Sequence, residues 1–523
     1  MTIEVTFHGA CGVVTGSCFE IRNASAGVLV DCGMFQGTKT VKQLNYLAFP
    51  FDPSKISTVL LTHAHIDHCG LLPKLRRSGF RGPIIATPET ADLLTYVLPD
   101  SGYVQEQEVV RLNRRNARRG RPAVEPIYTR ADGAACVRRV IARQVGRWIE
   151  VAPGFRARFW DAGHILGSAS IELAVEDGAG ASQTLLFSGD IGPGGKAIQG
   201  PPTAPSGVDY LFAESTYGDR IKPRVSDTAR RNSLRAEIKA GLRAGGLILI
   251  PAFAVERTQE LLVDLDWLFD RGALPTVPVF VDSPLAIKAT EVFAKHLPKM
   301  RATQPFNRPN LHYVGEAQRS HGLSRWRGGA IIIAGSGMCD AGRIKHHLKN
   351  NLSQSSATVL LVGYQAPGTL GRLLGTGAKR VRIEGEEVAV NARIRELTGY
   401  SGHADQEGLI SWIENRLPVR HQIFLVHGEE PARQALAVRL GTIERISNSV
   451  RMPQIGETVA LGHEGAHTTG IRARIDVAAA GVSDWHNSYA QALLSLRERL
   501  DAMPNDKARA ALLARITHAL RAP

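Results

Sequence analysis

His63-Ala64-His65-Ile66-Asp67-His68 begins one residue after the apolar run Val59-Leu60-Leu61. Three imidazoles and a carboxylate within six positions form a dense set of metal-binding groups. In an extended segment, His63 and His65 point to the same side. Asp67 and His68 lie where the chain turns toward a predicted helix at 69–75, so they can face a second ion. The segment therefore predicts two neighbouring metals, because these four groups would otherwise be desolvated for no gain.

The composition is typical of a folded chain with more than one core. The 523 residues are 44% hydrophobic, which is enough to bury at least two cores. The N-terminus lacks a basic region followed by an apolar stretch, and no apolar run reaches membrane-spanning length. We therefore expect a soluble, cytoplasmic protein without membrane association. The cysteines form no C-x-x-C pair and are expected to be reduced and buried; they are Cys11, Cys18, Cys32, Cys69, Cys136 and Cys339.

The charge favours an acidic partner. The formal net charge is +14, and nucleic acid is the commonest large polyanion in cytoplasm. One basic stretch at helical spacing predicts a cationic stripe, formed by Arg111, Arg114, Arg115, Arg118 and Arg119, with Arg121 just beyond. A solvated helix face explains this stripe as well as phosphate binding does.

Several predicted strands end in a residue that can do chemistry. Short apolar runs alternate with Gly-rich turns through the first third of the chain, a pattern that indicates a sheet layered with helices. Asp31, His63, His164 and Asp190 each follow such a run. Ligands placed at strand ends converge on one edge of the sheet.

From about Tyr217 the pattern changes to longer alternations of strand and helix, which are typical of a parallel sheet. Residues with ligand chemistry then return at strand ends, with His403 and His427. The middle region is therefore predicted to be a domain inserted into the first fold. After 462, a helical hairpin is expected, with a turn at 503–506; its apolar residues are Leu493, Leu496, Leu500, Leu512, Ile516 and Leu520. Packing on the body is favoured over dimerisation or partner binding.

These motifs, taken in order, carry a resemblance to a known family. The H-x-H-x-D-H run, Asp31, His164 in Gly163–Ala169 and Asp190 in Ser188–Asp190 resemble the successive motifs of the metallo-beta-lactamase fold. Over residues 1–461, the chain resembles the beta-CASP branch, which contains RNA-processing nucleases. The three beta-CASP motifs follow in order, and they contain Glu214 in Phe212–Gly218, then His403, then His427.

The resemblance implies an α/β fold: a metallo-beta-lactamase αββα sandwich, an inserted α/β beta-CASP domain and a short C-terminal helical tail. The expected boundaries are 1–217 and 392–461 for the two parts of the sandwich domain, 218–391 for the inserted domain and 462–523 for the tail.

The resemblance also implies the metal ligands. His63, His65 and His164 would hold one Zn²⁺, Asp67, His68 and His427 would hold a second, and Asp190 would bridge them. Imidazole and carboxylate suit zinc, and two such ions generate a hydroxide that can attack phosphorus. Asp31 is expected to support the ligands from behind. A strand-end aspartate that caps a turn is as good an interpretation of Asp31.

The resemblance further implies that His403 faces the substrate, oriented by Glu214. Such an imidazole could contact the scissile phosphate and protonate the departing oxygen. A buried structural His–Glu pair is the alternative.

Gly-rich turns in the middle region are candidates for substrate binding. Ser336 and Gly337 lie between an apolar strand and a predicted helix, where amides can meet a phosphate. Tyr364 and Arg372 lie in a segment that also resembles the family. Turn geometry and domain packing explain any one of these residues equally well. Two positions depart from the pattern, because Glu256 stands where Gly is expected and Gly402 where Ala is common.

The preferred function is a zinc-dependent ribonuclease that acts on single-stranded RNA in processing or decay. A DNA nuclease is a nearer rival than a small-molecule metallohydrolase. His427 favours RNA, because the last motif of DNA-specific relatives is typically not His. A small-molecule enzyme would not need the inserted domain, Glu214 or His403. An RNA-binding subunit without catalysis is a third interpretation. The choice between endonuclease and 5′ to 3′ exonuclease, and whether the chain forms a homodimer, stay open.

Overall fold

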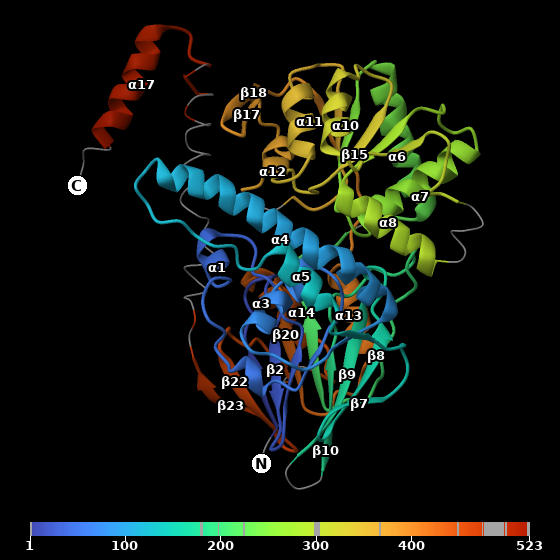
Figure 1. Cartoon of the computed structure of the whole chain (residues 1–523), viewed down its shortest axis with the longest axis vertical. Helices are drawn as coiled ribbons and strands as arrows, with labels where there is room; N and C mark the ends of the chain where they lie inside the picture. Colours follow the sequence, from blue (N-terminus) through green and yellow to red (C-terminus); the bar gives the residue numbers. More distant parts are fainter. Residues whose placement is uncertain are drawn as a thin grey trace.

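Two sheets packed face to face form the body that carries the site (Figure 1). The structure is a computed structural model and describes residues 3–177, 181–196, 198–222, 225–297, 304–365, 368–446, 449–472, 474, 496, 499–500 and 502–519. The eight-stranded sheet has the order β23-β22-β1-β2-β3-β4-β5-β6. Its strands are β1 Ile3–Phe7, β2 Phe19–Arg22, β3 Gly27–Val30, β4 Thr58–Leu60, β5 Ile84–Ala86, β6 Val140–Ala142, β22 Glu457–Gly462 and β23 Gly465–Ile471.

The seven-stranded sheet has the order β21-β20-β11-β10-β9-β8-β7. Its strands are β7 Ile149–Ala152, β8 Phe155–Asp161, β9 Ala169–Glu176, β10 Ser182–Phe187, β11 Tyr210–Glu214, β20 Gln422–Val426 and β21 Val450–Arg451. Alternate apolar side chains of the two sheets form one buried layer between them. Within this layer the rings of Phe187, Phe212 and Phe424 stack at centroid distances of 4.3 and 4.9 Å. The layer ties β20, late in the chain, to strands of the first half.

Helices cover the outer face of each sheet and complete an αββα sandwich. On the eight-stranded sheet these are α2 Ile66–Cys69, α3 Leu72–Arg77, α4 Pro88–Ala117 and α5 Arg130–Val137. The short helix α1 Lys39–Gln43 instead packs Val41 against the layer between the sheets. On the seven-stranded sheet they are α13 Gln406–Glu414 and α14 Glu430–Gly441. The predicted fold class is confirmed. One detail of the prediction is wrong: the helix expected at 69–75 is two helices that break at Gly70 and Leu71, so Asp67 and His68 lie inside α2.

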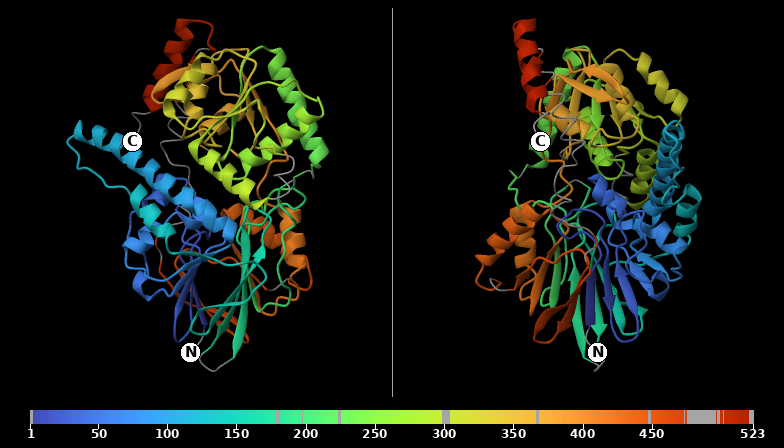
Figure 2. Two further views of the ribbon diagram at one scale, coloured as in Figure 1. Left: turned by 45° about the vertical axis from the view of Figure 1, so that its right-hand side comes forward. Right: turned by 90° about the vertical axis from the view of Figure 1, so that its left-hand side faces the viewer.

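The inserted region forms a three-layer α/β domain above the sandwich (Figures 1 and 2). Its six-stranded sheet has the order β14-β13-β15-β12-β16-β19, and every pairing in it is parallel. The strands are β12 Ile248–Pro251, β13 Val279–Asp282, β14 Leu311–Tyr313, β15 Ile331–Ala334, β16 Thr358–Leu361 and β19 Arg393–Glu396. The helices are α6 Asp227–Arg243, α7 Arg257–Asp270, α8 Pro284–His296, α10 Ala317–Gly322, α11 Ile344–Asn351 and α12 Leu370–Gly375. A hairpin, β17 Arg380–Ile383 and β18 Glu386–Ala389, follows α12.

The four domain boundaries stay a prediction, which the strand pairings refine. Strand β19 pairs with β16, so we propose that the inserted domain continues to about 396. Strands β22 and β23 pair with the first sheet, so we propose that the sandwich continues to 471. With these boundaries, all strands of one sheet belong to the same domain.

Helix α4 was missed as a whole from the sequence, which predicted only its arginine-rich end. It runs for 30 residues with Pro99 inside it. Its first half packs against the sandwich and against α8, where Lys295 and His296 pair with Asp92. The expected stripe lies at its C-terminal end and just after it, and all six arginines are exposed.

The tail is described only in part. Helix α17, Asp506–Ala519, begins at the predicted turn, where Asn505 Oδ1 accepts from the backbone N–H of Ala508 at 3.0 Å. Leu493 and Leu520 of the expected hairpin lie outside the described residues. All six cysteines are buried and unpaired, as expected. Among the described helices, none combines the length and apolar character that a bilayer span requires.

Candidate metal centre

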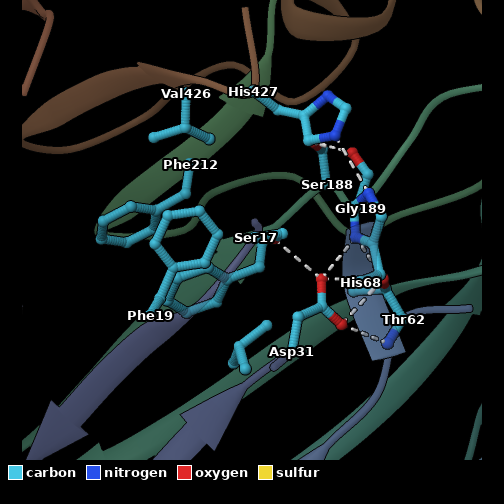
Figure 3. Close-up of a pocket in the computed structure, with 12 residues that line it drawn as sticks. Ser17, Phe19, Asp31, Thr62, His68, Ser188, Gly189, Phe212, Val426 and His427 are labelled. Atoms are coloured by element: carbon cyan, nitrogen blue, oxygen red, sulfur yellow. Dashed lines mark hydrogen bonds and ion pairs between the residues drawn. The ribbon is translucent and has the colours of Figure 1, made fainter. Parts of the chain in front are cut away.

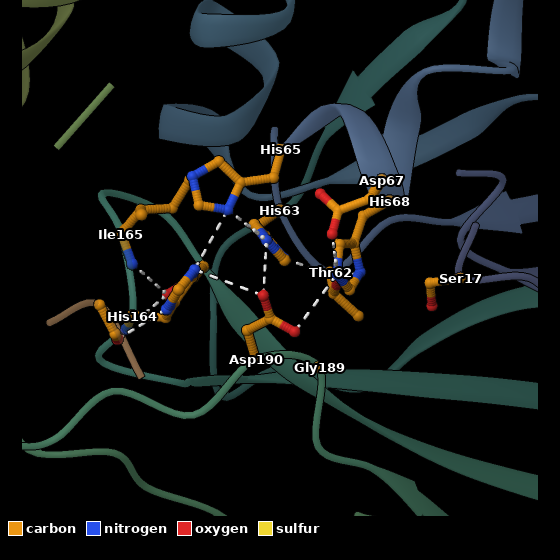
Figure 4. A network of polar contacts seen from close by, with 12 residues as sticks. Ser17, Thr62, His63, His65, Asp67, His68, His164, Ile165, Gly189 and Asp190 are labelled. Carbon is orange, nitrogen blue, oxygen red and sulfur yellow. Dashed lines mark hydrogen bonds and ion pairs between the residues drawn. The ribbon is translucent and has the colours of Figure 1, made fainter. Parts of the chain in front are cut away.

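The predicted ligands meet at one edge of the sandwich because their strands end there. His63 follows β4, His164 follows β8, Asp190 follows β10 and His427 follows β20. Asp67 and His68 lie in the short helix α2, directly after the β4 segment. Figure 4 shows the Asp190 carboxylate between two groups of side chains, with His65, His63 and His164 on one side and His68 and Asp67 on the other.

The first group surrounds one point with three imidazoles. Nδ1 of His65 lies 3.1 Å from Nε2 of His63 and 3.1 Å from Nε2 of His164. Asp190 Oδ2 lies 3.5 Å from His63 Nε2 and 3.4 Å from His164 Nε2. Four donor atoms therefore converge, one from each residue.

The second group lies on the other oxygen of the same carboxylate. Nε2 of His68 and Nε2 of His427 are 3.0 Å apart. Asp67 Oδ2 lies 3.6 Å from His427 Nε2, and Asp190 Oδ1 lies 3.2 Å from His68 Nε2. Asp190 thus reaches both groups with different oxygens, as a bridging ligand does.

The geometry and the donor chemistry fit zinc. A tetrahedral ion with bonds of about 2.05 Å separates its ligand atoms by roughly 3.3 Å, close to the spacings in both groups. Buried Oδ1 of Asp190 has no hydrogen-bond donor among the described residues, and a cation would satisfy it. Burial, together with neighbouring imidazoles, lowers the pKa of His65 to about 3 and that of His164 well below its usual value. Neutral imidazole is the form that binds a metal, so these two rings are ready to bind. In the second group the charge of Asp190 outweighs burial and raises the pKa of His68 and of His427, so a metal would bind there with release of protons.

Buried carboxylates support the same interpretation. Burial alone would raise the pKa of Asp190, but the surrounding histidines His427, His68 and His403 hold it well below its usual range. The pKa of Asp67 is likewise held well below its usual range, mainly by a hydrogen bond with His427 against the effect of burial. Both groups are therefore carboxylates, the ligand form.

Hydrogen bonds behind the rings fix which nitrogen faces the candidate metal site. His68 Nδ1 donates to Asp31 Oδ2 at 2.7 Å, and His164 Nδ1 donates to the carbonyl of Gly402 at 2.7 Å. Figure 3 shows Asp31 among Ser17, Thr62 and His68, and the Ser17 hydroxyl donates to its Oδ2 at 3.1 Å. The Nε2 atoms of both histidines are thereby left for a metal.

His403 lies beside the first group and has its own acidic partner. Its Nδ1 is 3.3 Å from Glu214 Oε2 and 3.9 Å from Asp190 Oδ2. Glu214 is fully buried at the end of β11, whereas the His403 side chain is 21% exposed. Since Nδ1 faces Glu214, Nε2 of His403 is left for a substrate.

Of the residues expected to bind substrate, the structure links Tyr364 to His403 through one aromatic ring, whereas Ser336, Gly337 and Arg372 have other surroundings. The Tyr364 ring meets that of Tyr217 edge-on at 6.2 Å, and Tyr217 meets His403 edge-on at 5.6 Å. Tyr364 is therefore one ring away from His403. Ser336 and Gly337 follow β15, and Gln365 Nε2 donates to the carbonyl of Gly337 at 2.9 Å. Arg372 is exposed on α12.

Sequence reasoning missed the hydroxyls that support the ligands. Thr62 Oγ1 lies 3.0 Å from both Asp31 oxygens and 3.0 Å from His63 Nδ1. Thr216 Oγ1 bonds to Glu214 and lies 3.1 Å from His427 Nδ1. Thr62 directly precedes His63 and Thr216 is two residues after Glu214, and this closeness in sequence is the signal that they carry. The Gly402 carbonyl carries no side-chain signal at all.

Three family profiles match successive parts of the chain. The metallo-beta-lactamase superfamily matches residues 11–247, the beta-CASP domain 258–374, and a Zn-dependent metallo-hydrolase RNA specificity domain 387–453. Together with the ligand geometry, these matches define a metallo-hydrolase of the sandwich-plus-insertion class.

Proteins of similar sequence identify the family within this class of metallo-hydrolases. Ribonuclease TTHA0252 of Thermus thermophilus is 36% identical over 446 residues, which cover 83% of this chain and 95% of that protein. An RNase J-like protein of Methanocaldococcus jannaschii is 30% identical, covering 82% and 93%. Transcription termination factor FttA of Methanosarcina mazei is 29% identical, covering 83% and 68%. The chain belongs to the beta-CASP family of the metallo-beta-lactamase superfamily.

A solved structure supports the fold alone. It is described as a protein of unknown function from Enterococcus faecalis V583 and has a TM-score of 0.52 at 14% sequence identity. The match covers 88% of this chain and 100% of that chain.

The Asp31→Ala variant tests the support behind His68. Loss of the carboxylate frees the His68 ring, and we expect zinc affinity to fall about 10- to 100-fold. Competition with a chromogenic chelator measures the affinity. Asp31→Asn should lose less, because Asn keeps the shape and tolerates the positive φ of 61° at this position. The exposed Asp52→Asn is the control, and an unchanged affinity in Asp31→Ala would leave Asp31 with a turn-capping role only.

Proposed function

We propose that this protein is a zinc-dependent ribonuclease that hydrolyses phosphodiester bonds of single-stranded RNA in RNA processing or decay. The observation that carries the proposal is the Asp190 carboxylate, which lies between two groups of metal-ligating side chains in a beta-CASP chain. We further propose that the protein acts in the cytoplasm. A homodimer stays a prediction.

Each side chain has a proposed role. His63, His65 and His164 would hold one Zn²⁺, Asp67, His68 and His427 a second, and Asp190 would join the two. When bound, the ions supply a hydroxide from water near neutral pH and counter the charge on the phosphate oxygens.

The proton for the leaving oxygen would come from His403. Glu214 fixes Nδ1 of this ring at 3.3 Å, so Nε2 can donate to the departing oxygen. The hydrogen bond of Thr216 to Glu214 holds the carboxylate on that side of the ring. Tyr364, Ser336, Gly337 and Arg372 are proposed to contact the RNA.

The comparisons favour RNA over the alternatives. Two of the similar proteins are named as a ribonuclease and an RNase J-like protein. One family profile describes RNA specificity. A DNA nuclease is the alternative, and the presence of His427 as the last ligand weighs against it.

Zinc content and RNA cleavage test the proposal together. We expect wild-type protein to bind zinc and to cleave single-stranded RNA, and Asp190→Ala to lose most of both, since both groups lose a shared ligand. Asp506→Ala, on exposed α17, is the matched control. Metal analysis and a gel assay with 5′ monophosphate, hydroxyl and triphosphate RNA give the readouts. Stable zinc binding without cleavage of any of these RNAs would refute a ribonuclease, and cleavage of DNA alone would favour the alternative.

His403→Ala separates proton donation from metal binding. We expect kcat to fall about 100-fold or more with zinc content unchanged, because His403 lies outside both ligand groups. The exposed His463→Ala is the control. Loss of zinc in His403→Ala would make His403 a ligand, and unchanged kcat would leave the His–Glu pair with a structural role.

We propose that the arginine-rich end of α4 binds the phosphate backbone of the RNA at a distance from the metal centre. Arg111, Arg115 and Arg118 share one helix face and are exposed. In the part of the chain that the structure describes, no carboxylate lies within ion-pair distance of them. The helix begins beside the metal centre, where the hydroxyls of Thr87 and Thr90 donate to the carbonyl of Gly167.

Replacement of Arg111, Arg115 and Arg118 by Gln should weaken binding of long RNA. Three lost phosphate contacts should reduce the slope of log affinity against log salt by roughly 2. Fluorescence anisotropy between 50 and 300 mM salt, about the physiological range, measures the slope. The same triple change at exposed Arg319, Arg325 and Arg327 removes equal charge elsewhere. Equal slopes in the two triple variants would show that the stripe is a solvated face.

A further inference from the structure

Glu256, just before helix α7, occupies a backbone conformation that favours glycine. Its φ is 73°, and only 3% of the residue is exposed. A non-glycine residue meets a steric cost in this region, because its Cβ crowds the neighbouring backbone. The carboxyl group is also buried, which adds a desolvation cost. The contacts of the Glu256 side chain must therefore contribute stabilisation that offsets both costs.

Those contacts reach from the inserted domain into the loop that carries His164. Glu256 Oε2 accepts from the backbone N–H of Leu166 at 3.0 Å. Gln199 Nε2 donates to the same oxygen at 3.1 Å and to Oε1 at 3.3 Å. Leu166 is two residues after His164, and Gln199 follows β10 of the sandwich. One carboxyl group therefore links α7 to two segments of the other domain.

The His164 loop is fastened from the sandwich side as well. The Ser168 hydroxyl accepts from the backbone N–H groups of His164 and Ile165 at 3.0 and 3.2 Å. Thr87 and Thr90 hold Gly167 from α4. In addition to these bonds within the sandwich, Glu256 holds the His164 loop by a hydrogen bond that depends on the position of the inserted domain.

The next residue of the chain approaches the other support of His164. The His164 ring donates to the carbonyl of Gly402, and a methyl group on Gly402 would lie 3.0 Å from that ring and 3.8 Å from Arg257 Nη2. The start of α7 thus borders His164 on two sides, through Glu256 at Leu166 and through Arg257 at Gly402. The absence of a side chain at 402 gives the ring and the guanidinium this space.

Among the residues that the structure describes, no cation pairs directly with the Glu256 carboxylate. Arg257 and Lys196 pair with Glu260 at 3.1 and 3.2 Å, whereas the hydrogen-bond donors to Glu256, the Leu166 amide and the Gln199 side chain, are neutral. Burial raises the pKa of Glu256 to about 7, with Lys196 lowering it and Glu260 raising it. The carboxyl group is therefore mostly neutral below pH 7 and becomes a buried negative charge above it.

We propose that Glu256 is a positioning residue through which the seating of the inserted domain holds the His164 loop, so that zinc retention and turnover depend on this domain contact. The inference rests on the proposed function only through the role of His164 as a metal ligand. Zinc release tests it without RNA.

Glu256→Gly is the decisive variant, because glycine tolerates the φ of 73° and removes the link. We expect zinc release to a chelator to become about tenfold faster and kcat to fall with little change in KM, while the melting temperature is maintained. Glu384→Gly is the matched control: Glu384 is also a glutamate at positive φ, 52°, but lies exposed in the β17–β18 turn. Zinc release and kcat at the wild-type values in Glu256→Gly would overturn the proposal.

Glu256→Gln supplies a second readout that simple packing would not change. The amide keeps an acceptor for Leu166 but does not ionise. With a pKa of about 7 in the closed state against 4.5 when solvated, ionisation favours opening of the contact as pH rises. Linkage predicts about tenfold more opening at pH 8 than at pH 6. The ratio of wild-type to Glu256→Gln release rates should rise over this range. A flat ratio would refute the link, and loss of RNA cleavage with this pattern intact would refute only the ribonuclease.

Discussion

The carboxylate of Asp190 is the constraint on which the rest of the structure depends. It is buried, ionised and surrounded by imidazoles, and its two oxygens face different ligand groups. A buried negative charge is costly unless cations or donors surround it. Here the neighbours come from separate strand ends, so the charge is balanced only when both sheets have closed around it. The metal centre therefore forms only when the two sheets of the sandwich are packed together. Metal binding would in turn stabilise this packed state.

Long-range packing delivers the last ligand. His68 and His427 lie 359 positions apart in sequence, yet their Nε2 atoms are 3.0 Å apart. The stacked rings of Phe187, Phe212 and Phe424 hold β20 in the sheet from which His427 emerges. The inserted domain occupies the interval between the halves, and its helix α7 returns to contact the His164 loop. The insertion is thus part of the support of the centre as well as a cover above it.

Much of the site could be predicted because its ligands are chemically dense and follow apolar strands. His63, His65, Asp67 and His68 are recognisable within six positions, and the distant ligands follow the same rule of strand ends. Their supports could not be predicted in the same way. The Gly402 carbonyl has no side chain to recognise, Thr62 and Thr216 are common residues, and Pro99 inside α4 is a residue that by sequence indicates a helix end. At Glu256 the sequence showed only a departure from the glycine of the family pattern, and the positive φ of the structure gives its physical meaning.

By itself, the sequence determined the layering of strands and helices, the insertion and the chemistry of the candidate ligands, since apolar periodicity and ligand type are local properties of the chain. The resemblance of its motifs to a known family added the particular fold. Only the tertiary structure decided which oxygen of Asp190 faces which group, which ring nitrogen is free, and which domain holds the His164 loop. These depend on distances of a few ångströms between residues hundreds of positions apart. The packing of two sheets and an inserted domain sets such distances, and no local pattern encodes them.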